Sequence, residues 1–165
     1  LEFVYNTNFA GARERYNEEG NRYFNAKINP QIAEALASDG WNIKWTKPGE
    51  NHPNPEEFVS EPYVVVTVGY KFRPPLIALI REVDGKEHVT PVTESTVALL
   101  DSMEFSNIDV AIRGVYWENS QGSGYKAWLK SMYATVKMDD LDRKYAHLMS
   151  VSSSSDAANS MEVTV

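Results

Sequence analysis

Aromatic residues alternate with cations at several places along the chain, a combination that could hold a negatively charged, ring-bearing ligand. Lys126, Trp128 and Lys130 are two residues apart, so on an extended strand they would share one side. Arg113 and Trp117 share a side by the same rule. Rings stack on unpaired bases for about 1–3 kcal/mol each, while cations neutralise the backbone between them. This pattern is typical of a surface for single-stranded nucleic acid.

The same reasoning assigns candidate roles to a larger set of residues. The candidate stacking residues are Tyr23, Trp45, Tyr63, Trp117 and Trp128. The candidate phosphate contacts are Arg22, Lys27, Lys44, Lys71, Arg73, Arg113, Lys126 and Lys130. Rings and lysines are also ordinary on the solvent side of an antiparallel strand, because lysine stems cover rings and aromatic residues pair across strands. The pattern alone leaves both interpretations open, and Trp41 is expected to pack in the core.

Five runs alternate apolar and polar residues with a period of two and predict half-buried strands. They cover residues 22–28, 41–47, 63–72, 108–117 and 125–137. The predicted inward side consists of Phe24, Ala26, Ile28, Val64, Val66, Val68, Tyr70, Phe72, Ile108, Val110, Ile112, Ala127 and Leu129. The opposite side carries most of the candidate rings and cations.

Two or three short helices are expected between and after these strands. Residues 30–37 begin after a possible N-cap at Asn29, have Pro30 in the first turn and end near Gly40. Their apolar side would be Ile32, Ala33 and Leu36. Residues 93–102 and 139–148 also show helical spacing, and the proline-rich residues 47–62 predict an exposed loop. Many short strands with few helices favour a small barrel or sandwich.

Net charge argues against a generic nucleic-acid binder. The 165 residues carry 16 basic and 23 acidic side chains, a balance of −7. Removing residues 139–165 takes away five acidic and two basic residues and leaves 14 basic against 18 acidic, or −4. Because nucleic-acid binders are usually basic, any such site must be a local cluster of cations.

Catalytic and metal-binding motifs are missing from the sequence. There is no cysteine, and His52, His88 and His147 are isolated, so neither thiolate nor zinc-binding spacing occurs. No phosphate-binding loop or nucleophile elbow is present. We therefore expect no catalytic residue, no metal and no cofactor, with a nuclease using Asp109 as a remote alternative. The longest apolar run, residues 76–80, is far shorter than the roughly 20 residues of a membrane span.

Several segments, in order, resemble a tailed-bacteriophage family of single-stranded DNA-binding proteins. They are residues 8–11, 21–24, 39–44, 73–75, 107–113, 117–118, 124–133 and 139–145. The resemblance covers about residues 4–147. It implies an OB-fold-like, five-stranded antiparallel barrel in residues 1–148. It also implies a protein that coats single-stranded DNA in the host cytoplasm during phage replication or recombination. The serine-rich composition of residues 149–165 separately predicts a flexible tail.

The resemblance implies single-stranded DNA as the partner. Replication or recombination proteins and a second copy of the chain are further candidate partners, and no membrane is expected. The tail of this chain, residues 149–165, differs from the tails of bacterial single-stranded DNA-binding proteins. Asp156 and Glu162 are its only acidic residues, and it has no acidic run that ends in Pro-Phe. The main alternative is a phage structural or protein-interaction β-barrel that never binds DNA, which the acidic balance favours. Motif order and the ring–cation pattern together favour single-stranded DNA binding.

Overall fold

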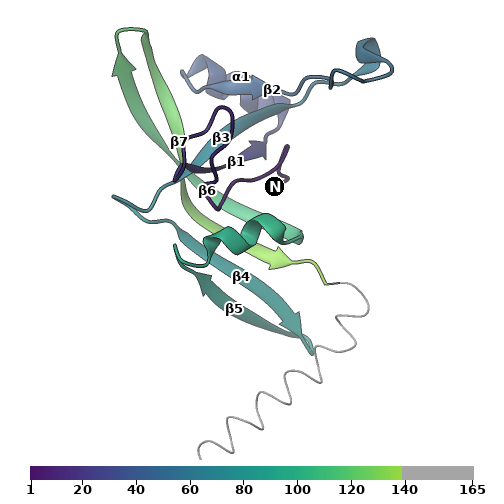
Figure 1. The fold of residues 1–165 in the computed structure, drawn as a ribbon, viewed down its shortest axis with the longest axis vertical. Coiled ribbons are helices and arrows are strands. Elements are labelled where there is room, and N and C mark those ends of the chain that lie inside the picture. Colours follow the sequence, from purple (N-terminus) through teal and green to yellow (C-terminus); the bar gives the residue numbers. More distant parts are fainter. Residues whose placement is uncertain (139–165) are drawn as a thin grey trace, which may run out of the picture.

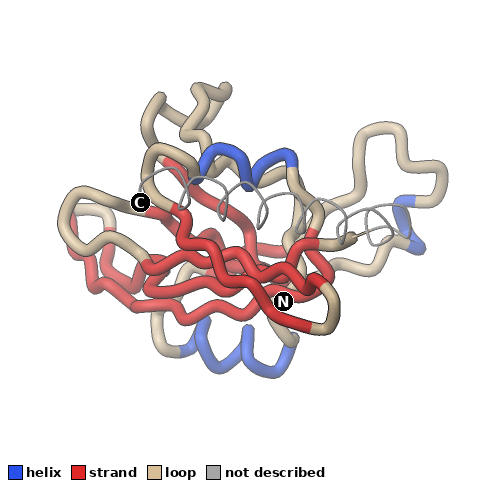
Figure 2. The backbone as a smooth tube through the Cα atoms, turned by 90° about the horizontal axis from the view of Figure 1, so that it is seen from below, coloured by secondary structure: helices blue, strands red, loops and turns tan. Residues whose placement is uncertain are grey.

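The computed structural model describes residues 1–138, which form a mainly β structure (Figure 1). Its strands are β1 (Arg22–Lys27), β2 (Ile43–Trp45), β3 (Pro62–Val68), β4 (Leu76–Val83), β5 (Lys86–Val92), β6 (Phe105–Asn119) and β7 (Gly122–Val136). Its helices are α1 (Pro30–Ser38) and two 3-10 helices, η1 (Pro55–Glu57) and η2 (Val97–Ser102). The strands form the centre, with helices on opposite sides of them (Figure 2).

Strand β7 organises the sheet. One edge of β7 pairs with β6 along almost its whole length, antiparallel. The other edge runs parallel first to β3 and then to β4. Strand β3 continues to β1, and β4 continues to β5. The sheet therefore divides at β7 into a β3–β1 arm and a β4–β5 arm, and the tips of the β6–β7 and β4–β5 hairpins point to opposite ends of the molecule (Figure 1).

The expected five-stranded antiparallel barrel is wrong in strand number, direction and closure. The structure has seven strands in one mixed sheet, and its order β1-β3-β7-β4-β5 does not return to its start. The strands that the sequence analysis missed, β4 and β5, form a hairpin around Asp84 and Gly85, both with positive φ. An Asp-Gly pair is a strong hairpin signal. Strand β5 is almost wholly exposed, so it lacks the apolar alternation on which the prediction depended.

The core confirms most of the predicted inward side. Phe24 and Ala26 of β1, and Val66 of β3, are fully buried. They pack with Leu129 of β7 and with Val97 of η2. The prediction for Phe72 is wrong, because β3 ends at Val68 and the side chain of Phe72 is 82% exposed in the following loop. Ile32 is also exposed, because α1 buries only Ala33.

The helix boundaries follow the predicted capping residues. The Asn29 side chain accepts a hydrogen bond from the Gln31 backbone N–H (2.8 Å), and α1 ends just before Gly40, which has φ +92°. The second predicted helix is shorter than expected, because only Val97–Ser102 is helical. The predicted helix at residues 139–148 and the predicted tail at residues 149–165 lie outside the described residues.

The side chain of Asp101 has a structural role at the end of η2. Its two carboxylate oxygens accept hydrogen bonds from the backbone N–H groups of Phe9 and Ala10, each at 2.8 Å. The Thr7 hydroxyl donates to the same carboxylate (2.7 Å). Asp101 thereby fixes the N-terminal segment over the core. Among residues 1–138, no helix has both the length and the apolar character needed to cross a membrane.

Candidate nucleic-acid interface

Strand register places residues from four strands in one row across the sheet. Tyr23 of β1 pairs with Thr67 of β3, Thr67 pairs with Trp128 of β7, and Trp128 pairs with Arg113 of β6. Paired residues point to the same side of a sheet. The neighbouring residues Val66, Ala127 and Leu129 point to the other side and are buried. The row therefore lies on the solvent side of the sheet.

We call this solvent side the outer face. By register it carries Tyr23, Asn25, Lys27, Lys44, Tyr63, Val65, Thr67, Arg113, Val115, Trp117, Lys126 and Trp128. Eight of these twelve are candidate residues from the sequence, drawn from five different strands. The sequence spacing predicted which residues share a side within each strand, and the strand register places these sides together on one face of the sheet.

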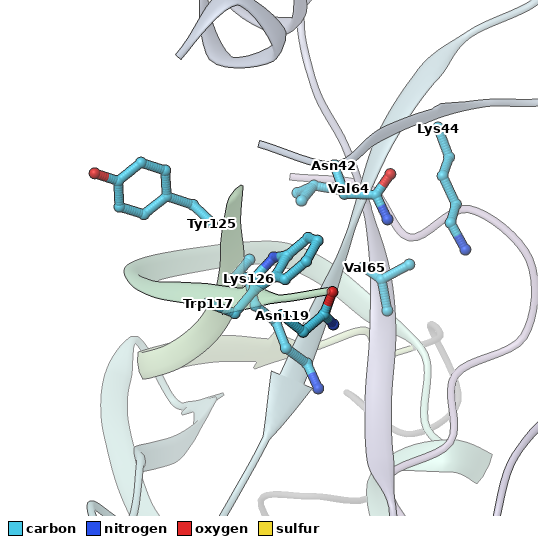
Figure 3. Close-up of a pocket in the computed structure, with 9 residues that line it drawn as sticks. Asn42, Lys44, Val64, Val65, Trp117, Asn119, Tyr125 and Lys126 are labelled. Carbon is cyan, nitrogen blue, oxygen red and sulfur yellow. The ribbon is translucent and has the colours of Figure 1, made fainter. Parts of the chain in front are cut away.

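A first hollow on the outer face, which we call the fork groove, lies where β2 and β7 separate. Both strands pair with the same edge of β3, β2 as far as Val64 and β7 from Val66 onward. The groove has a volume of about 430 Å³. Its lining residues are Asn42, Lys44, Val64, Val65, Trp117, Asn119, Tyr125, Lys126 and Ala127. Figure 3 shows Trp117 and Asn119 facing Val65, with the Tyr125 ring pointing away.

A second hollow, the arginine groove, lies beside the β6–β7 hairpin and has a volume of about 460 Å³. It is lined by Phe72, Arg73, Arg113, Gly114, Val115, Tyr116 and Trp128. Two guanidinium groups therefore flank rings in one hollow. Because Arg combines a permanent charge with a planar group, this lining suits a phosphate next to a stacked base.

A third hollow, the loop groove, lies between residues 14–17 and the end of β2, with a volume of about 460 Å³. It is lined by Glu14, Arg15, Tyr16, Asn17, Tyr23, Asn25, Lys44 and Val65. Lys44 and Val65 also line the fork groove, so these two hollows adjoin. The Lys126 ammonium, which lines the fork groove, lies 5.6 Å from the centre of the Trp128 ring in the arginine groove. The three hollows together form one path along the outer face.

Trp128 is half-buried and lies directly over Gly69. A Cβ atom added at Gly69 would come within 2.2 Å of Cζ3 of the Trp128 ring. Its indole N–H is buried and has no hydrogen-bond partner among the described residues. Gly69 thus allows the six-membered ring of Trp128 to approach the backbone closely, and Trp128 also lines the arginine groove.

Replacing Gly69 with alanine should displace the Trp128 ring without removing any side chain of the proposed site. The backbone at Gly69 does not have a positive φ, so strain in the backbone itself is small. If Trp128 stacks on a base worth about 1–3 kcal/mol, losing its position should weaken single-stranded DNA binding severalfold. Titration of labelled oligo-dT measures this loss, and Gly49→Ala is the matched control because nothing lies within 4 Å of its added Cβ. Unchanged affinity for Gly69→Ala would contradict a role for the ring.

Two candidate cations, Lys27 and Arg22, form ion pairs with carboxylates. Lys27 forms ion pairs with Glu61 (2.8 Å) and Glu2 (3.1 Å), and these hydrogen bonds raise the pKa of Lys27. Arg22 pairs with Glu94 (3.4 Å) and lies 5.4 Å from the centre of the Tyr70 ring. Within residues 1–138, the remaining candidate cations form no ion pair: Lys44, Lys71, Arg73, Arg113, Lys126 and Lys130.

Tyr23 is held at the end of the row by an acidic partner. Its hydroxyl donates to a carboxylate oxygen of Glu14 (2.8 Å). Burial, with the hydrogen bond and negative charge of Glu14, raises the pKa of Tyr23 to about 12. Tyr63 packs edge-to-face on Tyr5 at 5.7 Å, and burial raises its pKa. Both phenols therefore stay neutral at physiological pH.

The structure separates a few candidates from this path. Trp45 alternates with Lys44 along β2 and pairs with the buried Pro62, so it points to the opposite side of the sheet. Lys71 lies in the loop after β3, with its ammonium 5.6 Å from the centre of the Phe72 ring. Lys130 is exposed at a β-bulge, since Ala111 pairs with Ser131 and Ile112 with Leu129.

The sequence analysis missed several groove residues, among them Phe72, Tyr116, Asn42 and Asn119. Phe72 was assigned to the core because it continued the alternation of β3. Gly69 and Pro74 on either side of it are signals that the strand ends before Phe72. The two asparagines gave no signal, because they meet only when the β6–β7 hairpin lies beside β2.

An aromatic stack on the other side of the hairpin holds it in place. Trp41 stacks on Tyr125 with ring centres 5.8 Å apart, and Tyr125 N–H donates to the Gly40 carbonyl (3.0 Å). A Cβ at Gly114 would come within 2.7 Å of the Trp41 ring, so glycine allows this approach. The expected packing of Trp41 against the core is confirmed. The stack thereby joins the segment before β2 to the β6–β7 hairpin, which carries Trp117.

Fold and surface together define a mainly β protein whose solvent side joins rings with cations, most of which form no ion pair within residues 1–138. Residues 3–162 match the family model described as "Putative phage ssDNA-binding domain". The chain belongs to this family, which confirms the resemblance seen in the sequence. No curated protein and no solved structure gives a significant match.

Acidic and histidine side chains form no candidate metal centre in the described part of the chain. No group of three or more His, Asp or Glu residues among residues 1–138 is placed to hold a metal ion. Asp109, the residue considered for a nuclease, accepts a hydrogen bond from the Asn107 amide (2.9 Å) on the exposed surface of β6. This hydrogen bond occupies one oxygen of the Asp109 carboxylate.

Proposed function

We propose that this protein binds single-stranded DNA along the outer face, with little dependence on base sequence and without catalysis. The observation that carries the proposal is the row Tyr23–Thr67–Trp128–Arg113, which runs across the sheet from the loop groove, lined by Tyr23, to the arginine groove, lined by Trp128 and Arg113. Membership of the phage family supports DNA as the ligand. The proposal extends to an OB-type mode of binding and to protection of DNA during phage replication or recombination.

Each group has a defined role in this proposal. Trp128, Trp117 and Tyr23 stack on bases, and Tyr63 lies beside Lys44 as a further ring. The phosphate contacts are Lys44, Arg73, Arg113 and Lys126, with Lys71 and Lys130 at the margin. Arg22 and Lys27 contact phosphate only if their carboxylate partners release them. Trp45 has no role, because it lies on the other side of the sheet.

The grooves explain a preference for single strands. Half-buried rings such as Trp128 can be reached by a base only when that base is unpaired and unstacked. A duplex presents its phosphates but keeps its bases inside, so it would gain the electrostatic contacts without the stacking. The same arrangement explains how a chain with net charge −7 can bind a polyanion. Carboxylates pair with Lys27 and Arg22, whereas Lys44, Arg73, Arg113 and Lys126 form no ion pair in the described part of the chain.

The salt dependence of binding tests this proposal. For a single strand, the slope of log affinity against log salt is about −0.7 for each neutralised phosphate. Four contacts, from Lys44, Arg73, Arg113 and Lys126, give a slope of about −3. Affinity for labelled oligo-dT should then fall on the order of 50-fold between about 50 and 200 mM salt. A flat response would contradict the proposal.

A protein-interaction module is the second candidate function. Two highly exposed apolar side chains favour it, Phe72 (82% exposed) and Val59 (79% exposed). The net negative charge of the chain favours it as well. This candidate predicts no shift of labelled single strands at any salt concentration and a defined complex with another protein. The salt series therefore separates the two candidates.

A further inference from the structure

The fork groove has side chains that could distinguish one base from another, which stacking and phosphate contacts cannot do. Its floor is the diverging edge of β3 at Val64 and Val65. Trp117 forms one wall, and its ring packs over the backbone of Gly122 and Gly124. A planar base entering the groove would meet the Trp117 ring on one side and polar side chains at its edge (Figure 3).

The amide of Asn119 is fixed in one orientation. Its Oδ1 accepts a hydrogen bond from the backbone N–H of Gln121 (2.9 Å) in the turn of the β6–β7 hairpin. A flipped amide would place an NH₂ group against that N–H, so Nδ2 must be the free end. Asn119 therefore offers a hydrogen-bond donor that is already held in place at the groove.

Donors outnumber acceptors among the side chains that line the groove. Lys44 and Lys126 can only donate, and so can the indole N–H of Trp117. Asn42 makes no side-chain hydrogen bond within residues 1–138 and can turn to offer either its oxygen or its NH₂. A base edge rich in acceptors would thus be satisfied here, whereas an amino group would find few partners.

We propose that the fork groove holds one base of the bound strand and prefers a keto base at that position. Thymine and uracil present the acceptor O4 where cytosine presents an amino group, and guanine presents O6 where adenine presents an amino group. The fixed donor of Asn119 would bind the keto oxygen, and the Asn42 amide could accept from the adjacent ring N–H. The inference rests on the proposed function, since it assigns a base preference to the same surface.

Oligo-dU and oligo-dC of equal length test the preference with a matched pair. Uracil and cytosine have rings of equal size and neither carries a methyl group. The comparison therefore isolates the effect of the hydrogen-bonding edge of the base. A homopolymer also ensures that the same base enters the groove in every register. One hydrogen bond of typical net strength predicts that oligo-dU binds about 2- to 10-fold more tightly than oligo-dC. Equal affinities would overturn the inference while leaving the proposed function intact.

The variant Asn119→Asp identifies the residue responsible. It keeps the oxygen that accepts from Gln121 and replaces the free donor with an acceptor, so the turn is preserved. The added charge should weaken both ligands alike, but the ratio of dU to dC affinity should fall to about one or below. Asn51→Asp, in the exposed loop before η1, is the control and should leave the ratio unchanged. The inference would be overturned if Asn119→Asp kept the dU-to-dC affinity ratio of the unmodified protein. If the unmodified protein bound neither oligomer, the proposed function would be rejected instead.

Discussion

Replacing Trp128 with alanine is expected to weaken binding of oligo-dT by about 1–3 kcal/mol, or about 5- to 150-fold. Trp128 is the ring at the centre of the row on the outer face, between Thr67 of β3 and Arg113 of β6. It also supports the Lys126 ammonium 5.6 Å from its ring centre. Loss of the ring should therefore remove one stacking site and loosen one phosphate contact. Fluorescence anisotropy of labelled oligo-dT measures the change.

Two further variants show whether the loss reflects the site or the fold. Trp45→Ala removes the same residue type from the opposite side of the sheet, where 45% of the side chain is exposed, and should leave affinity unchanged. Trp128→Phe keeps a ring over Gly69 and should retain most of the binding. Thermal unfolding of each variant monitors stability. If Trp128→Ala unfolds, the Trp128 ring belongs to the core and its assignment to the outer face is wrong. If Trp45→Ala weakens binding as much as Trp128→Ala does, the outer face is not the binding surface.

Reversing the charge of Arg113 and Lys126 together is expected to lower affinity by on the order of 50-fold at about 50 mM salt. Each cation neutralises one phosphate in the proposal, and two lost contacts should reduce the salt slope by about 1.4. Neither side chain forms an ion pair within residues 1–138, so the substitutions break no salt bridge there. Both side chains point to solvent on the β6–β7 hairpin, so the fold should tolerate glutamate.

The control for net charge is a double variant on the β4–β5 hairpin. Each Lys or Arg to Glu change alters the charge by −2, so Arg81→Glu with Lys86→Glu reaches −11, as does Arg113→Glu with Lys126→Glu. Both control residues are exposed on strands that contribute nothing to the grooves. The control should lose little affinity and keep its salt slope. Equal losses in the two double variants would mean that only overall charge matters.

Alternation along single strands was enough to predict which side of each strand faces solvent. It placed Phe24 and Leu129 inside and Tyr23, Arg113 and Trp128 outside, as the structure shows. The period of two is a local property of an extended chain, so it can be seen without knowing the partner strands. The cap at Asn29 was predictable for the same reason.

Strand partners and grooves could not be predicted, because they depend on pairing between distant residues. The pairings of β2 and β7 with the same edge of β3 create the fork, which Lys44, Trp117 and Asn119 line. Nothing in the sequence near Asn119 indicates that it will lie across from β2. Trp45 was kept as a stacking candidate although it alternates in step with Trp41, and its pairing with the buried Pro62 places it on the side opposite to Lys44.

Competition between single- and double-stranded DNA of the same mixed sequence tests the central claim most directly. Protein bound to a labelled single strand is titrated with unlabelled single strand and, separately, with unlabelled duplex at one fixed salt concentration. The account predicts that the single strand competes at far lower concentration, because only unpaired bases reach the rings of the outer face. Equal competition by duplex, or no binding of the labelled strand, would contradict it.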